Sequence, residues 1–184
     1  MSEALSPEAV QAATERWLLE AVIGLNLCPF ARAPQLQGRV RIVVSQAKHI
    51  DGFLDDLDAE LLRLRDTPAE ELETTLLVHP SMFPDFFVFN DFANVVDEVI
   101  DEHGLSDDLE FVLFHPDLVF EGADADSAEN LPNRSPFPML HLLRTESLER
   151  AVPEGDTSDI LARNRETLKG WRADEWRARW STPL

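Results

Sequence analysis

Apolar residues recur along the chain at two different periods, and these periods predict alternating strands and helices. Short runs of aliphatic and β-branched residues predict three strands, at 40–45, 73–79 and 109–115. Apolar residues at helical spacing predict two intervening helices, at 51–66 and 85–103. This order favours parallel strands, because each helix returns the chain across the sheet before the next strand begins.

Further elements flank this central unit. Ser6-Pro7-Glu8 is typical of a helix start, and apolar residues at helical spacing follow it as far as Gly24. Met139–Arg144 predicts a fourth strand, Thr145-Glu146 is typical of a helix start after it, and 156–169 predicts an amphipathic helix. The expected fold class is α/β: three parallel strands in β-α-β-α-β order plus this fourth strand, with helices packed on the sheet.

The chain of 184 residues is long enough for one domain with a hydrophobic core. We expect a single α/β domain over 1–170 and a C-terminal tail over 171–184 that is rich in Trp and Arg. Trp176 and Trp180 lie four residues apart and so share one helical face. That face is suited to packing back onto the domain, to a homodimer or partner contact, or to a membrane surface.

Two of the predicted strands end in the same dipeptide, His-Pro. The strand at 73–79 ends in His79-Pro80, and the strand at 109–115 ends in His115-Pro116. Ligands of parallel α/β sheets bind outside the carboxyl ends of the strands, so both imidazoles are expected at one crevice. Histidine titrates near neutral pH and serves there as an acid or a base. The alternative is that each His caps its strand while Pro ends the hydrogen-bonded ladder.

Cys28 is the only cysteine, and it lies in the turn-like segment Asn26-Leu27-Cys28-Pro29-Phe30 after the first predicted helix. A nearby histidine would activate its thiol as a nucleophile. The alternative is an inert, buried thiol. The candidate catalytic residues are therefore His79, His115 and Cys28, and Asn26 is a candidate substrate-binding residue.

A long polar stretch at 117–133 follows the third strand and predicts a lid, a binding loop or a mobile segment. It ends in Asn133-Arg134-Ser135, where the Arg134 guanidinium offers a planar fork for a carboxylate or a phosphate. Asn133, Ser135 and His141 are candidate hydrogen-bonding groups for the same substrate. The alternative for Arg134 is an ion pair with acidic residues of the loop itself.

A metal site is a further hypothesis. His79, His115 and His141 would supply three imidazoles, with Asp117 as a carboxylate alternative. Their spacings of 36 and 26 residues match no compact ligand motif, so the cofactor stays unknown. The chain has no glycine fingerprint for nucleotides or dinucleotides.

Charge and composition narrow the expected partners and location. The net charge is −19, and 23 acidic residues face only two basic ones between Asp51 and Glu129. Such a chain repels phosphate backbones, which argues against nucleic-acid binding. No apolar run reaches the roughly 18–20 residues of a membrane span. The N-terminus lacks a secretory pattern and the lone cysteine forms no internal disulfide, so a cytoplasmic protein without membrane contacts is expected.

Several segments together resemble one family: Ile23-Gly24-Leu25-Asn26-Leu27-Cys28-Pro29-Phe30, the two His-Pro strand ends, and Asn133 through Arg144. The family is bacterial, occurs also in plants, and is a conserved domain of unknown function. The resemblance extends from Ala13 to Leu168 and so excludes the tail. It implies a single-domain member, and it brings no activity, cofactor or site residue with it.

The leading hypothesis is an enzyme, a hydrolase or a group transferase, that acts on a small anionic metabolite at the strand ends. His79 and His115 would be acid/base groups, Arg134 would bind the anion, and Cys28 would be an optional nucleophile. The alternative from another class is a non-catalytic adaptor that docks a partner through its acidic surface or its tryptophan tail. A His-based metalloenzyme is the third hypothesis.

Overall fold

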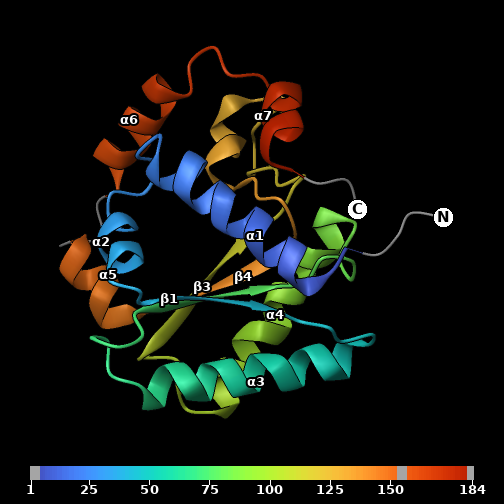
Figure 1. Ribbon diagram of the computed structural model, residues 1–184, viewed down its shortest axis with the longest axis vertical. Coiled ribbons are helices and arrows are strands. Elements are labelled where there is room, and N and C mark those ends of the chain that lie inside the picture. Colours follow the sequence, from blue (N-terminus) through green and yellow to red (C-terminus); the bar gives the residue numbers. More distant parts are fainter. Residues whose placement is uncertain (1–4, 153–156, 182–184) are drawn as a thin grey trace.

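The computed structural model describes residues 5–152 and 157–181, and its centre is a four-stranded sheet with helices on both faces (Figure 1). The strands are β1 (Val40–Val44), β2 (Thr74–Val78), β3 (Leu109–Phe114) and β4 (Met139–Arg144), in the spatial order β1-β2-β4-β3. β1 pairs parallel with β2, and β4 pairs antiparallel with both β2 and β3. The three predicted parallel strands therefore share one direction, but β4 separates β2 from β3.

The two helices predicted between the strands cover one face of this sheet. They are α3 (Ile50–Asp66) and α4 (Phe86–Glu102). Asp85 caps α4 by accepting the N–H groups of Phe87 and Val88, and the chain leaves the helix at Gly104 with φ +66°. The apolar stripes of both helices pack on the inner face of the sheet, chiefly Phe53, Leu57, Leu61, Phe89 and Val96 against Leu77, Leu140 and Leu142.

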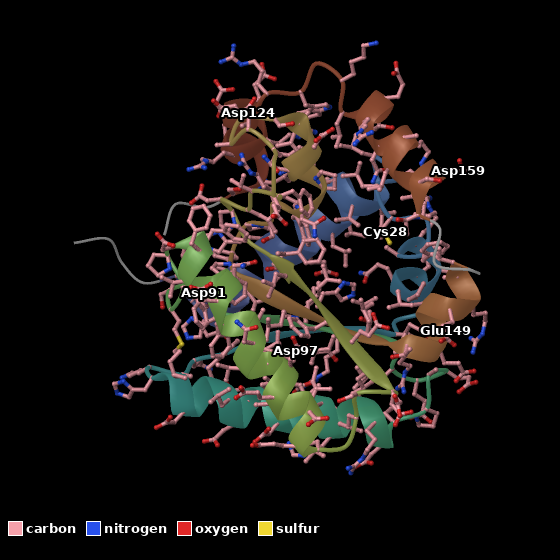
Figure 2. The ribbon with its side chains drawn as sticks, turned by 180° about the vertical axis from the view of Figure 1, so that it is seen from behind. Cys28, Asp91, Asp97, Asp124, Glu149 and Asp159 are labelled. Atoms are coloured by element: carbon pink, nitrogen blue, oxygen red, sulfur yellow. The ribbon has the colours of Figure 1, made fainter. Side chains whose placement is uncertain are left out.

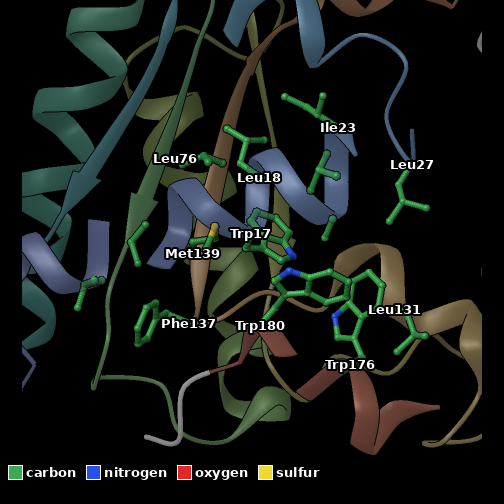
Figure 3. Packing of buried hydrophobic residues seen from close by; sticks show 14 of the residues in the cluster. Trp17, Leu18, Ile23, Leu27, Leu76, Leu131, Phe137, Met139, Trp176 and Trp180 are labelled. Atoms are coloured by element: carbon green, nitrogen blue, oxygen red, sulfur yellow. The ribbon is translucent and has the colours of Figure 1, made fainter. Parts of the chain in front are cut away.

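The opposite face is covered by the N-terminal helix. α1 (Pro7–Trp17) starts as the Ser-Pro-Glu pattern predicts, with the Ser6 hydroxyl accepting the Ala9 N–H at 3.2 Å, and it continues as the π-helical segment η1 (Leu18–Ile23). Alternate strand residues supply the other side of this core. Figure 3 shows its centre, with Trp17, Leu18 and Ile23 beside Leu76, Phe137 and Met139.

The remaining elements are α2 (Arg32–Leu36), the 3-10 helix η2 (Ala128–Asn133), α5 (Thr145–Ala151), α6 (Ser158–Thr167) and α7 (Ala173–Trp180). α2 and η2 are short and have no periodicity that predicts them. The helix expected over 156–169 appears as α6, and its expected first residue lies outside the described ranges.

The tail packs back onto the body, which is the first of the three interpretations above. Trp176 and Trp180 on α7 are 0% and 2% exposed and belong to the same core cluster as Trp17 (Figure 3). Both indoles therefore contribute apolar area to folding, and neither offers a free face to a partner or a membrane. The described part of 171–184 is thus an integral layer over α1.

Candidate functional site

His79 follows β2 directly and is 3% exposed. Its Nε2 lies 2.8 Å from the carbonyl oxygen of Ala47, and its Nδ1 accepts the backbone N–H of Met82 at 2.8 Å. A carbonyl only accepts, so this arrangement requires a neutral ring with the proton on Nε2. Burial also lowers the pKa of His79, although the hydrogen bond to Ala47 partly offsets that effect.

His115 repeats this arrangement after β3. It is 0% exposed, its Nε2 donates to the carbonyl of Phe83 at 2.8 Å, and its Nδ1 accepts the N–H of Asp117 at 3.0 Å. Burial lowers the pKa of His115, so this ring is also held neutral. The ring centroid lies 5.6 Å from that of Phe86 on α4, within the aromatic core.

The open crevice expected at the His-Pro strand ends needs correction. Both histidines do follow the carboxyl ends of their strands, at the same end of the sheet, but β4 lies between the two strands. Each ring turns toward the α3 and α4 side and uses both nitrogens on backbone groups. No ring nitrogen is then left to exchange a proton with a substrate, whereas strand capping accounts for every bond.

Arg134 is also occupied. It is 5% exposed, and its guanidinium donates to the carbonyls of Leu118 at 3.0 Å and Ala125 at 2.5 Å. Burial lowers its pKa, and the nearby Arg177 acts in the same direction. Arg134 thus fastens the backbone of the acidic stretch 117–133. Two donors of the fork expected to bind an anion, on Nε and Nη2, are engaged by the loop's own carbonyls.

Two further predicted residues have local structural roles. Ser135 is 0% exposed and donates its hydroxyl to the carbonyl of Phe137 at 2.6 Å. Asn26 adopts φ 53°, a left-handed conformation that Asn tolerates, and its carbonyl accepts the Arg163 guanidinium at 3.1 Å. These bonds do not connect Ser135 or Asn26 to His79 or His115.

The three-histidine metal set does not assemble. His141 lies on β4 opposite Leu76 and Val112, on the α1 face, whereas His79 and His115 pack on the α3 and α4 face. Asp117, the carboxylate alternative, pairs with Arg177 on α7. Within the described ranges no group of three or more His, Cys, Asp or Glu side chains is arranged to hold a metal ion.

A cavity of about 280 Å³ on the α1 face unites three other predicted residues. Cys28 enters it from the segment before α2, Asn133 from the end of η2, and His141 from β4. Most of its wall is apolar and comes from α1, η1, the segment before α2, the sheet and α5. The apolar lining residues include Trp17, Leu18, Val22, Phe30, Leu76, Val112, Phe114, Leu143 and Leu148. This cavity is the candidate functional site.

The imidazole of His141 is a polar group within this mainly apolar wall. No hydrogen bond joins it to any residue that the structure describes, and its nearest aromatic ring is that of Phe114, 5.9 Å between centroids. Burial lowers the pKa of His141 to about 4, so the ring is neutral at physiological pH. A neutral imidazole presents one donor and one acceptor to the cavity.

The other ionisable groups around the cavity are protonated or paired. Burial raises the pKa of the Cys28 thiol, although backbone N–H groups of Phe30 and Ala31 partly oppose that effect. Glu73 is bonded to Arg39 at 2.9 Å. Arg144 donates to the carbonyls of three residues: Leu64, Thr67 and Leu72. The described wall therefore offers hydrogen bonds and apolar contact, but no unpaired charge.

Sequence reasoning missed most of this wall. Thr74, Val112 and Ser147 line the cavity but were not among the candidate site residues. The signal that was available is the alternation along 139–144, which puts Met139, His141 and Leu143 on one face of a strand. A polar His in the middle of an otherwise apolar face marks a place where the core is interrupted.

The model of the family described as "Protein of unknown function (DUF1415)" matches residues 9–178. The chain belongs to this family. The match includes most of α7, so family membership extends into the tail, beyond the span of the resemblance noted above.

Other comparisons add no relative. Neither a curated protein nor a solved structure matches the chain. Among the described residues, no helix has the length and apolar character needed to cross a membrane. Function must therefore be argued from the site itself.

Proposed function

We propose that this DUF1415 protein binds a small, mainly apolar and uncharged molecule in the cavity between α1 and the sheet. The observation that carries the proposal is the His141 imidazole, which faces a largely apolar hollow and has no hydrogen-bond partner among the described residues. Ligand sites are typically apolar hollows with a few convergent polar groups. The volume of about 280 Å³ lies near the lower end of the usual range and suits a small ligand.

An uncharged ligand is favoured over the anionic metabolite that the sequence suggested. The His141 ring is neutral, and the guanidinium of Arg144 already serves three carbonyls. A carboxylate or phosphate would lose its hydration in this cavity without gaining a free positive charge. An amide, phenol or ketone would instead gain a hydrogen bond from the imidazole.

The enzyme hypothesis retains one form, in which Cys28 acts as a nucleophile and His141 as its base. Both side chains line the same cavity, and this favours the pair over His79 and His115. However, burial raises the pKa of the thiol and lowers that of the imidazole, and both shifts oppose proton transfer from sulfur to nitrogen. Binding therefore ranks ahead of thiol catalysis.

Thermal-shift screening with a matched fragment set tests the proposal. We expect neutral aryl amides and phenols to raise the melting temperature, and the corresponding carboxylates and phosphates to leave it unchanged. His141→Phe, which keeps the ring shape and removes the hydrogen bonds, should weaken binding on the order of three- to tenfold. Leu143→Trp, which fills the cavity, should abolish it. His49→Phe changes an exposed histidine and is the control.

The thiol gives a second readout of the same site. A ligand in the cavity should slow alkylation of Cys28 by N-ethylmaleimide, because the sulfur lies on the cavity wall. Fragments that bind only as anions, or that bind equally well to Leu143→Trp, would refute the proposal. A Cys28 that alkylates rapidly near neutral pH, with a lowered pKa, would restore the catalytic form.

A further inference from the structure

β3 is the last strand on one side of the sheet, so half of its backbone N–H and carbonyl groups have no neighbouring strand to bond with. The order β1-β2-β4-β3 leaves β3 paired with β4 alone. Two bonds fix the phase of this ladder: the His79 N–H donates to the Pro138 carbonyl on one side of β4, and the Thr145 N–H donates to the Asp108 carbonyl on the other. The backbone N–H and carbonyl groups of even-numbered β3 residues therefore bond to β4, and those of odd-numbered residues point outward, away from β4.

The outward groups are largely unpaired. The Leu113 carbonyl accepts the Asn133 side-chain N–H at 3.3 Å, and the His115 N–H donates to the Asn133 carbonyl just beyond the strand. No described residue pairs with the N–H or carbonyl of Phe111, or with the N–H of Leu113. An apolar edge of this kind is a template for another extended chain.

The start of this edge is acidic. A hollow of about 340 Å³ is lined there by Asp107, Asp108, Glu146 and Glu149, together with Arg65 and Arg144. The Arg144 guanidinium is already bound to three backbone carbonyls. Arg65 is already paired with Asp66, and Glu146 with Arg150. Asp107, Asp108 and Glu149 take part in no ion pair within the described ranges. This end is therefore suited to a Lys or Arg side chain.

The other end of the edge is apolar. A second hollow, of about 220 Å³, lies between β3, the first turns of α4 and the segment 118–121, and Phe86, Leu113, Leu118 and Phe120 contribute to its wall. Phe87 and Val88 on the same turns are 68% and 61% exposed, and Phe120 is 43% exposed. Large apolar side chains are thus left in water beside an unpaired strand.

Acidic side chains flank the edge from both sides. Figure 2 shows β3 running between α4, which carries Asp91 and Asp97, and α5, which carries Glu149. The chain as a whole has a net charge of −19. A second copy of this chain would bring the same excess of negative charge to the edge, whereas a basic partner is attracted to it.

We propose that the outer edge of β3 docks an extended segment of a basic partner protein as a fifth strand of the sheet. The segment's backbone pairs with the outward N–H and carbonyl of Phe111 and with the outward N–H of Leu113, whose carbonyl already accepts the Asn133 side chain. A basic side chain near one end of the segment lies at Asp107 and Asp108, and apolar side chains near the other end enter the hollow beside Phe86 and Phe120. Main-chain bonds then supply affinity, and the two hollows supply specificity.

Two blocked octapeptides of alternating valine and threonine test this proposal. One carries two lysines at its amino end, the other at its carboxyl end, so that both strand directions are sampled. We expect one of them to bind in isothermal titration at low ionic strength and to bind more weakly as salt is added. The same peptide with glutamates in place of lysines should show no binding.

The contribution of the peptide's backbone hydrogen bonds to binding can be measured by changing the peptide and leaving the protein unchanged. Methylating alternate backbone nitrogens of the binding peptide removes donors and should weaken it on the order of tenfold or more. Asp107→Asn combined with Asp108→Asn should weaken it roughly three- to tenfold. The matched control, Asp51→Asn with Asp55→Asn, removes the same charge from exposed positions on α3 and should have no effect.

Three outcomes would overturn the proposal. These are equal binding of the N-methylated peptide, equal binding of the glutamate peptide, or no binding of either lysine peptide at roughly millimolar concentration. A wild-type dimer protected from hydrogen exchange at 109–113 would assign the edge to a second copy instead. Leu143→Trp fills the small-molecule cavity and Asp107→Asn with Asp108→Asn removes charge from the start of the edge, so failure of the two proposals is distinguishable.

Discussion

Trp17 and Trp176 donate their indole N–H groups to the same acceptor, the carbonyl oxygen of Arg134, at 3.1 and 3.0 Å. One residue belongs to the first helix of the chain and the other to the last. The shared carbonyl therefore joins α1, α7 and the end of the acidic stretch 117–133. The buried oxygen accepts on both lone pairs, and each indole contributes a large apolar area around it.

The first prediction concerns this shared acceptor. Trp17→Phe and Trp176→Phe should each cost about 1–2 kcal/mol in free energy of unfolding, because one indole still satisfies the carbonyl. The double variant should cost more than the sum, because the buried oxygen then has no donor. Urea denaturation of the four proteins measures the coupling. Trp171→Phe is the control, since the Trp171 indole N–H bonds to no described residue. Strict additivity would contradict the shared role.

We expect Arg134 to stabilise the acidic stretch 117–133 and not to bind a ligand. Arg134→Met removes charged hydrogen bonds to the Leu118 and Ala125 carbonyls and should cost about 2–4 kcal/mol. Hydrogen exchange should rise over 118–127, and Arg134→Lys, which keeps the charge, should recover only part of the stability. A stable Arg134→Met protein that loses affinity for anionic fragments would instead support the anion-binding role.

His115 should behave as a strand cap. His115→Phe preserves aromatic packing on Phe86 but leaves the Phe83 carbonyl and the Asp117 N–H without the ring as their partner. We expect a loss of about 2–4 kcal/mol, measured by urea denaturation, against no change for the exposed control His49→Phe. An equally stable His115→Phe protein would reopen the case for a catalytic imidazole.

His141 should make stability depend on pH. Its folded pKa of about 4 lies below the ordinary value of 6.5. Between these two pH values the unfolded chain binds a proton at His141 and the folded protein does not. The stabilisation is present above about pH 6.5 and is lost as the pH falls toward 4, by at most about 3 kcal/mol. Water within the cavity would reduce this value, because the ring lines an accessible hollow.

The comparison with His141→Phe isolates that effect. His79 and His115 also have lowered pKa values and act in the same direction, whereas protonation of surface carboxylates relieves self-repulsion. The difference in unfolding free energy between wild type and His141→Phe should therefore be followed from pH 7.5 to roughly pH 4.5. A difference that does not vary with pH would show that His141 titrates normally.

The elements were predictable because their signals are local. The helix start at Ser6-Pro7 and the strand at Met139–Arg144 depend on caps and alternation within a few residues, and the structure confirms both. The order of the strands was not predictable in this way. No local pattern indicates that β4 enters between β2 and β3, because that choice depends on long-range packing of both faces.

The candidate site was predictable in part. Cys28, Asn133 and His141 were singled out for their chemistry, and the structure places all three on one cavity wall. His79 and Arg134 were expected to bind a substrate, but both are hydrogen-bonded to backbone groups, the carbonyls of Ala47, Leu118 and Ala125. Any residue type supplies a carbonyl, so sequence carries no trace of such a bond. The sequence alone does not distinguish a buried arginine that is bound to backbone carbonyls from one that is free to bind a ligand.

The insertion of β4 between β2 and β3 also determines when the sheet becomes complete. β3 leaves the ribosome about 25 residues before β4, and β2 and β3 make no ladder with each other. During synthesis the sheet therefore stops at β1 and β2, with β3 tethered through α4 and unpaired on both sides. The apolar run from Leu109 to Phe114 depends on a strand that is synthesised later, so the nascent chain is most exposed to aggregation after β3 has emerged from the ribosome and before residues 139–144 have emerged.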